Sequence, residues 1–163
     1  MLLLCPFACI KKLLIMPSVE HRVTINRSVA EIFRFMVDFS NNPKWQPPSI
    51  QLERSGKVRV GDMVVGMQRM MGQMRHVNAD VIDYSPNQRL VYKGVMGSYN
   101  FRTTYDFNFS GAGGTEIAIS TEIRIPWWNI MFRPFIMRGI DGQIQTSMQN
   151  LKQFLDDRRD LGT

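Results

Sequence analysis

Three side chains of this sequence could take part in carbonyl or acid–base chemistry: Arg69, Tyr99 and Tyr105. In the segment GDMVVGMQRMMG, Arg69 shares a strand face with Met63 and Met67, where a guanidinium could hold a ligand carboxylate or enolate. Alternatively, Arg69 lies at the end of its strand and extends its guanidinium into water. Tyr99 and Tyr105 could orient a carbonyl group by hydrogen bonding if both point inward.

The remaining polar residues do not form a catalytic or metal-binding motif. His76 shares its strand face with Asp80, and His21 lies in the comparable segment EHRV, so both histidines are expected to face solvent. Cys5 and Cys9 have a C-x3-C spacing without a second pair of ligands. Nucleophile elbows, phosphate loops, HExxH motifs and paired carboxylates are missing from the sequence. We therefore expect no metal, no cofactor and no dedicated catalytic pair.

The apolar spacing predicts one strand and one helix at the start of the globular region. VEHRVTI (19–25) alternates apolar and polar residues, as a half-buried strand does. In the following segment, Ser28 and Glu31 have capping-box spacing, and apolar residues then recur at helical intervals. This helix ends at DFSNNPKWQPPSI (38–50), whose prolines favour extended backbone. Trp45 in this segment should point inward, either as a core plug or as part of a binding site.

Glycine-rich turns then separate about six further strands, followed by a long helix. YNFRTTYDFNF and TEIAISTEIRI each place apolar residues on one face, which predicts a long hairpin. After Pro134, isoleucine, methionine and leucine residues recur every three or four positions, as on an amphipathic helix. Gly139 and Gly142 fall early in that helix and suggest a kink or a close approach to the sheet.

The composition fits a single domain that folds without metal or disulfide. The 163 residues are 44% hydrophobic, and a chain of this length can bury about 70% of its unfolded surface. We expect residues 16–163 to form this domain and residues 1–15 to be an N-terminal extension, with Met16 as the functional start. Both cysteines lie in that extension, which fits a cytoplasmic protein.

The charge pattern does not favour a nucleic-acid partner. The formal net charge is +6, but lysines and arginines after residue 22 are scattered singly, as on solvated faces, with only Arg158 and Arg159 adjacent. A weak attraction to an anionic membrane surface is compatible with this excess. The sequence does not predict an oligomeric state.

Several segments together resemble a known family. SVAEIFRFMVDFSNNPKW, GDMVVG, VIDYSPNQRLVYKG, GGTEIAI and LKQFL are similar to the SRPBCC superfamily, the START-like proteins labelled polyketide cyclase/dehydrase and lipid transport. The resemblance covers roughly residues 19–158. It implies an α+β helix-grip fold, in which a curved antiparallel sheet of about seven strands wraps around the C-terminal helix. Two short helices would follow the first strand.

That architecture implies an internal cavity for a hydrophobic small molecule or lipid, which the protein would transport, sense or store. We expect large, adaptable side chains to line it. The predicted lining comprises Trp45, Met67, Tyr99, Phe101, Tyr105, Phe107, Ile119, Thr121, Ile123, Ile140 and Ile144. Alternatively, these residues fill a core without a usable cavity. A cyclase or dehydratase acting in the same cavity is the second interpretation, although it requires a positioned acid or base.

A third interpretation is a membrane- or partner-docking module. IPWWNIMFRPF (125–135) places Trp127, Trp128 and Phe132 just before the long helix. Tryptophan and arginine side chains are favoured at membrane interfaces. The same aromatic residues could instead belong to a first helical turn packed on the sheet.

Overall fold

A computed structural model describes residues 16–48, 50–53, 57–111 and 113–157. The extension predicted over residues 1–15 lies outside the described residues. The described chain contains one seven-stranded antiparallel sheet with the order β1-β7-β6-β5-β4-β3-β2. Its strands are β1 (Ser18–Ile25), β2 (Ile50–Leu52), β3 (Met63–Met70), β4 (Gln73–Ser85), β5 (Arg89–Met96), β6 (Tyr99–Ser110) and β7 (Gly114–Arg124).

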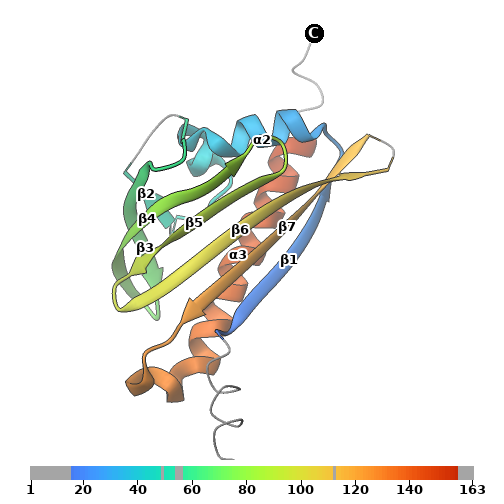
Figure 1. The fold of residues 1–163 in the computed structure, drawn as a ribbon. Coiled ribbons are helices and arrows are strands. Elements are labelled where there is room, and N and C mark those ends of the chain that lie inside the picture. The colour runs from blue at the N-terminus through green and yellow to red at the C-terminus, as the bar shows by residue number, and fades with distance from the viewer. Residues whose placement is uncertain (1–15, 49, 54–56, 112, 158–163) are drawn as a thin grey trace, which may run out of the picture.

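The helices lie on the concave side and at the ends of this sheet. They are α2 (Val29–Val37), the 3-10 helix η2 (Phe39–Lys44), the 3-10 helix η3 (Trp127–Phe132) and α3 (Arg133–Asp157). Figure 1 shows the sheet curving around α3, with α2 across one end of the sheet. The predicted α+β helix-grip fold, with two short helices after the first strand, is confirmed.

The long hairpin forms because β6 and β7 carry matching apolar faces. Tyr105 pairs with Ile119 and Phe101 pairs with Ile123, so their side chains share the concave face. The hairpin tip extends beyond the neighbouring strands (Figure 1), and the β5–β6 ladder begins only at Arg89 and Asp106. Phe109 near this tip is therefore exposed, although its strand position gives it the parity of the concave face.

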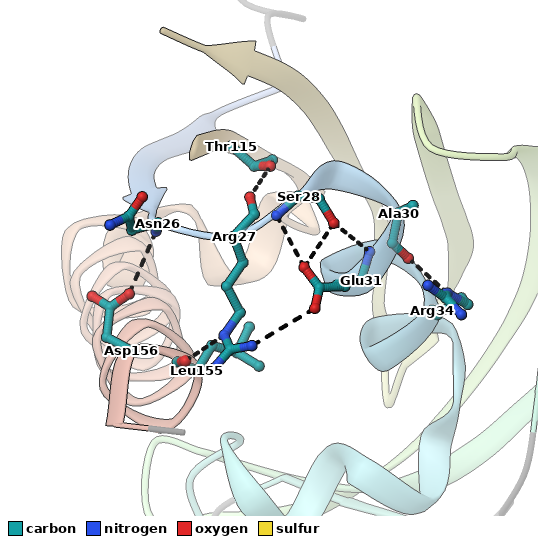
Figure 2. Close-up of polar contacts among 9 residues, drawn as sticks. All are labelled: Asn26, Arg27, Ser28, Ala30, Glu31, Arg34, Thr115, Leu155 and Asp156. Atoms are coloured by element: carbon teal, nitrogen blue, oxygen red, sulfur yellow. Dashed lines mark hydrogen bonds and ion pairs between the residues drawn. The ribbon is translucent and has the colours of Figure 1, made fainter. Parts of the chain in front are cut away.

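The start of α2 is fixed by the predicted capping box. The Ser28 backbone N–H donates to Glu31 Oε2 at 3.2 Å, and the Glu31 N–H donates to Ser28 Oγ (Figure 2). The Ser28 hydroxyl also donates to Glu31, which lowers the pKa of that carboxyl below its usual value. Ile32, Phe33, Met36 and Val37 then bury one face of the helix.

The connection between β1 and α2 holds the C-terminal end of α3. Arg27 Nε donates to the Leu155 carbonyl oxygen at 2.6 Å, which satisfies one of the free carbonyls at the end of the helix (Figure 2). The Arg27 carbonyl in turn accepts from Thr115 Oγ1 on β7. This loop therefore joins the helix end to the sheet.

Helix α3 buries the apolar face that its spacing predicts, formed by Ile136, Ile140, Ile144, Met148, Leu151 and Leu155. His21 does not face solvent as expected, because the inner face of β1 is covered by α3. Its Nε2 lies 2.7 Å from Asp141 Oδ1. A Cβ atom at Gly139 or Gly142 would meet nothing within 4 Å, so of the two predicted alternatives the close approach to the sheet is wrong, and the kink stays a prediction.

Candidate functional site

A cavity of about 150 Å³ lies between the concave face of the sheet and α3. Its walls come from every layer of the fold. The sheet contributes Val64, Gln68, Val77, Ala79, Leu90, Tyr92, Met96, Phe101, Thr103, Tyr105, Ile119, Thr121 and Ile123. Helix α3 contributes Ile140, Gln143, Ile144 and Ser147, and the segment from α2 to β2 contributes Met36, Phe39, Asn42, Trp45, Gln46, Ile50 and Leu52.

The chemistry of these walls is apolar with a few neutral polar groups. The described residues lining the cavity include no Asp, Glu, His, Cys, Lys or Arg. Thr103 and Thr121 hydroxyls hydrogen-bond to each other at 3.0 Å, and Ser147 Oγ donates to the Gln143 carbonyl at 2.9 Å. In the described parts of the chain, His, Cys, Asp and Glu side chains form no group of three that could hold a metal ion.

Most of the residues predicted from sequence to line a cavity do so. Trp45 is buried at the end of η2, and seven of the predicted positions on β6, β7 and α3 also line the cavity. The lining positions are Trp45, Phe101, Tyr105, Ile119, Thr121, Ile123, Ile140 and Ile144. Whether they contact a ligand stays a prediction.

Met67 and Arg69 lie outside the cavity. Val64 and Gln68 line it, and Met67 and Arg69 have the opposite strand parity, so both point to the convex face of β3. Arg69 is exposed, and its backbone carbonyl accepts from Gln143 Nε2 at 2.6 Å. The Arg69 guanidinium is therefore not placed to hold a ligand in this cavity.

Tyr99 and Phe107 are buried but pack against other elements. The Tyr99 hydroxyl accepts from Asn129 Nδ2 at 2.6 Å, which ties η3 to the sheet, and the Arg75 guanidinium lies 5.7 Å from the Tyr99 ring centre. The Phe107 ring meets Phe33 of α2 edge to face at 5.2 Å. Both residues face inward, but their ends of β6 are covered by helices and do not border the cavity.

A second pocket of about 450 Å³ adjoins the first. The two share Gln68, Met96, Ile140 and Gln143. The second is also bounded by Arg69, Phe132 and Phe135, among others, so the predicted candidate Arg69 borders this pocket and not the first. Gln68 Nε2 donates to Gln143 Oε1 at 2.6 Å. This amide pair therefore lies where the two hollows meet.

Residues 16–156 match the family described as polyketide cyclase/dehydrase and lipid transport. The chain belongs to this family. The match confirms the SRPBCC, START-like resemblance found in the sequence. Among the curated proteins, none matches the chain in sequence.

Solved structures share the family's fold at low sequence identity. Protein TTHA0849 from Thermus thermophilus is similar, with 15% identity, a TM-score of 0.73, and coverage of 88% of this chain and 100% of its own. Protein CV1439 from Chromobacterium violaceum has 16% identity, a TM-score of 0.66, and coverage of 85% and 97%. A START superfamily protein from Mycobacterium smegmatis has 13% identity, a TM-score of 0.65, and coverage of 86% and 97%.

Two tyrosines give the cavity of this family member its phenolic hydroxyl groups. Burial raises the pKa of Tyr92 well above its ordinary value, and Tyr105, 6.1 Å away between ring centres, adds to that shift. Burial also raises the pKa of Tyr105. Both phenols therefore stay protonated at neutral pH and can donate a hydrogen bond, for example to a carbonyl oxygen.

Sequence reasoning missed Tyr92 and most of the polar lining residues. Tyr92 has the strand parity of Leu90 and Met96, so the alternation of QRLVYKGVM could have revealed it. Gln143 precedes Ile144 on the helix and reads as part of the polar face. Asn42 and Gln46 belong to a proline-punctuated segment without a periodic pattern, so no sequence signal marks them.

Proposed function

We propose that the protein binds a small hydrophobic molecule in the cavity between the sheet and α3. The observation that carries the proposal is the hollow itself. Protein interiors are normally packed without voids larger than a water molecule. An apolar cavity of about 150 Å³ in a protein core can take up a benzene-sized molecule. A wall of aliphatic, aromatic and neutral polar side chains suits such a ligand.

The size of the cavity limits what it can hold without rearrangement. Sites for drug-sized ligands usually measure about 300–1,000 Å³, so the first cavity fits one small ring or the end of a lipid chain. A longer ligand would have to pass the Gln68–Gln143 pair and continue into the second pocket. Transport, sensing and storage all use this binding step.

The cyclase or dehydratase alternative finds less support in the lining. Such reactions need an acid or base with a pKa near the working pH. Among the described lining residues, the tyrosines are the titratable ones, and burial moves the pKa of Tyr92 and Tyr105 further from neutrality. Their hydroxyls can orient a carbonyl, which serves binding as well as turnover.

The direct test is whether the protein carries a hydrophobic molecule when it is purified. We expect denaturing extraction and mass spectrometry to find a small neutral species near one equivalent. Ser147→Leu projects a larger side chain from α3 into the cavity, so this variant should lose the species. An equal amount in a folded Ser147→Leu protein would contradict the proposed site.

A second proposal concerns η3, which we suggest rests on an anionic membrane surface. Trp127 is 80% exposed, Trp128 is 59% exposed and Phe135 is 71% exposed. Arg124, Arg133 and Arg138 flank them, and residues 123–140 contain no Asp or Glu. Amphipathic surfaces with aromatic and basic residues bind the headgroup region. Among the described residues, no helix is long and apolar enough to cross a membrane.

A further inference from the structure

We infer that the η2 end of the cavity is a polar subsite that selects neutral ligands carrying a carbonyl group, over hydrocarbons and over anions. The inference rests on the proposed function, because it describes how a ligand in that cavity would be recognised. The subsite would narrow the ligand to neutral carbonyl compounds, whereas an apolar wall alone would accept any small hydrophobic molecule.

Three side chains on one turn of the chain form this subsite. Asn42 and Trp45 are 4% and 3% exposed, and both line the cavity together with Gln46. The Trp45 and Gln46 backbone N–H groups both donate to the Asn42 carbonyl, at 3.2 and 2.8 Å. Residues three and four apart on a turn lie on the same side, so the three side chains are neighbours.

Each of these side chains has an unpaired polar atom. Asn42 Nδ2, Trp45 Nε1 and Gln46 Oε1 are buried and have no hydrogen-bond partner among the described residues. Buried polar groups are almost always paired, because burying a donor or acceptor without a partner is costly. Asn42, Trp45 and Gln46, which carry these two donors and one acceptor, all line the same cavity, so a ligand that brings an acceptor oxygen to this end would give the two donors the partner they lack.

The subsite is held in place by other elements. Asn150 Nδ2 of α3 donates to the Trp45 carbonyl at 3.1 Å, which joins η2 to the helix that forms the opposite wall. The Asp38 carboxylate caps η2 by accepting from the Ser40 N–H at 3.1 Å. Tyr92, which lines the same cavity, packs on Phe39 at the start of η2 with ring centres 5.9 Å apart. A prearranged site loses little freedom when it binds.

The charge of the ligand follows from the rest of the wall. The described residues that line the first cavity offer no lysine, arginine or histidine to pair with an anion, and Arg69 borders only the second pocket. An ionised carboxylate would be buried beside neutral donors alone, which does not compensate for its lost hydration. A neutral ketone, ester or similar carbonyl compound can use the Asn42 and Trp45 donors without that cost.

Calorimetric titration at pH 7 with three probes of one shape tests this selectivity. The probes are isopropylbenzene, methyl phenyl ketone and benzoate, each with a single ring. We expect the ketone to bind most tightly, by up to about tenfold over isopropylbenzene for each hydrogen bond gained, and benzoate to bind most weakly. Equal affinity for ketone and isopropylbenzene, or tightest binding of benzoate, would overturn the subsite. Failure of all three probes to bind would instead contradict the proposed function itself.

Substitutions at Asn42 and Trp45 test whether these two residues cause the preference for the ketone. Trp45→Phe removes the indole donor and keeps an aromatic ring, and Asn42→Leu removes the amide at similar volume. Each should reduce ketone affinity several-fold and leave isopropylbenzene affinity unchanged. Trp128→Phe, at an exposed position on η3, is the matched control and should alter neither. Should both folded cavity variants retain the full preference for the ketone, the assignment to Asn42 and Trp45 would be wrong.

Discussion

Tyr92 and Tyr105 show how single residues set the chemistry of the cavity. Burial is the first cause of the raised pKa at both, so each phenol remains a neutral donor where an exposed tyrosine would begin to ionise. The two rings meet edge to face, an arrangement that stabilises aromatic pairs. The cavity therefore keeps the same hydrogen-bonding groups across the neutral and mildly alkaline range.

The raised pKa of these tyrosines predicts a loss of stability at alkaline pH. An unfolded tyrosine ionises at about pH 10, whereas the folded protein holds both protons at higher pH. Their contribution to the free energy of unfolding is therefore complete below about pH 10 and declines as pH rises towards the folded values. We expect Tyr92→Phe/Tyr105→Phe to show a shallower decline in urea unfolding between pH 9 and pH 11. A decline as steep as in the wild type would contradict this origin.

Residue positions in the cavity could be predicted only where a strand face is purely apolar. Tyr105 and Ile119 belong to strands that alternate cleanly, so the pattern alone placed both on the concave face. On β3 apolar residues do not mark the inner face, since the polar Gln68 points inward and the apolar Met67 points outward. The inward position of Gln68 is compensated by its hydrogen bond to Gln143, a partner 75 residues away that the local sequence does not reveal.

At the scale of elements, α3 is held by contacts spread along its length. His21 lies beside Asp141, Gln68 hydrogen-bonds to Gln143, and Lys152 Nζ donates to the Thr24 carbonyl at 2.6 Å. Apolar spacing predicted the helix and its buried face. These polar contacts depend on the way the sheet curves, which the sequence pattern does not describe.

Two glycines should respond oppositely to the same substitution. A Cβ at Gly142 of α3 would meet nothing within 4 Å, so Gly142→Ala should stabilise the protein by about 1 kcal/mol through helix propensity. At Gly94 of β5 the added atom would collide with the Asn78 carbonyl oxygen and Ala79, so Gly94→Ala should destabilise it by about 1–3 kcal/mol. Thermal unfolding of both variants measures the difference. A destabilised Gly142→Ala protein would show that α3 needs a glycine for another reason.

For the whole molecule, the sheet wraps a helix and leaves a hollow between them. The long hairpin and the final helix follow from periodicity and turn residues. The curved sheet around the helix was implied by the family resemblance, which the family match confirms, and the position of β1 beside β7 does not follow from any local pattern. The cavity volume could not be predicted, because it is a small difference between the space under the sheet and the side chains that fill it. Trp45 illustrates this: its burial was expected, but its unpaired indole N–H depends on the neighbouring atoms.

The exposed aromatic surface of η3 predicts membrane association of the whole protein. We expect the protein to float with vesicles containing anionic phosphatidylglycerol and to float less with purely zwitterionic vesicles. Trp127→Ala/Trp128→Ala should abolish most of this association, because it removes aromatic area from the interface. Phe109→Ala is the matched control, since Phe109 is 74% exposed at the far hairpin tip. If the wild type does not float, or the tryptophan variant floats equally well, the docking proposal fails.

The central claim is that a small neutral molecule occupies the cavity beside α3, and a calorimetric titration with benzene tests it most directly. Ser147→Leu and Thr146→Leu form a matched pair, because both hydroxyls donate to a backbone carbonyl four residues earlier on α3. Ser147 lines the cavity, whereas Thr146 is exposed. We predict binding near one equivalent for the wild type and Thr146→Leu, and at least tenfold weaker binding for folded Ser147→Leu. Unchanged affinity in Ser147→Leu, or no binding by the wild type, would contradict the claim.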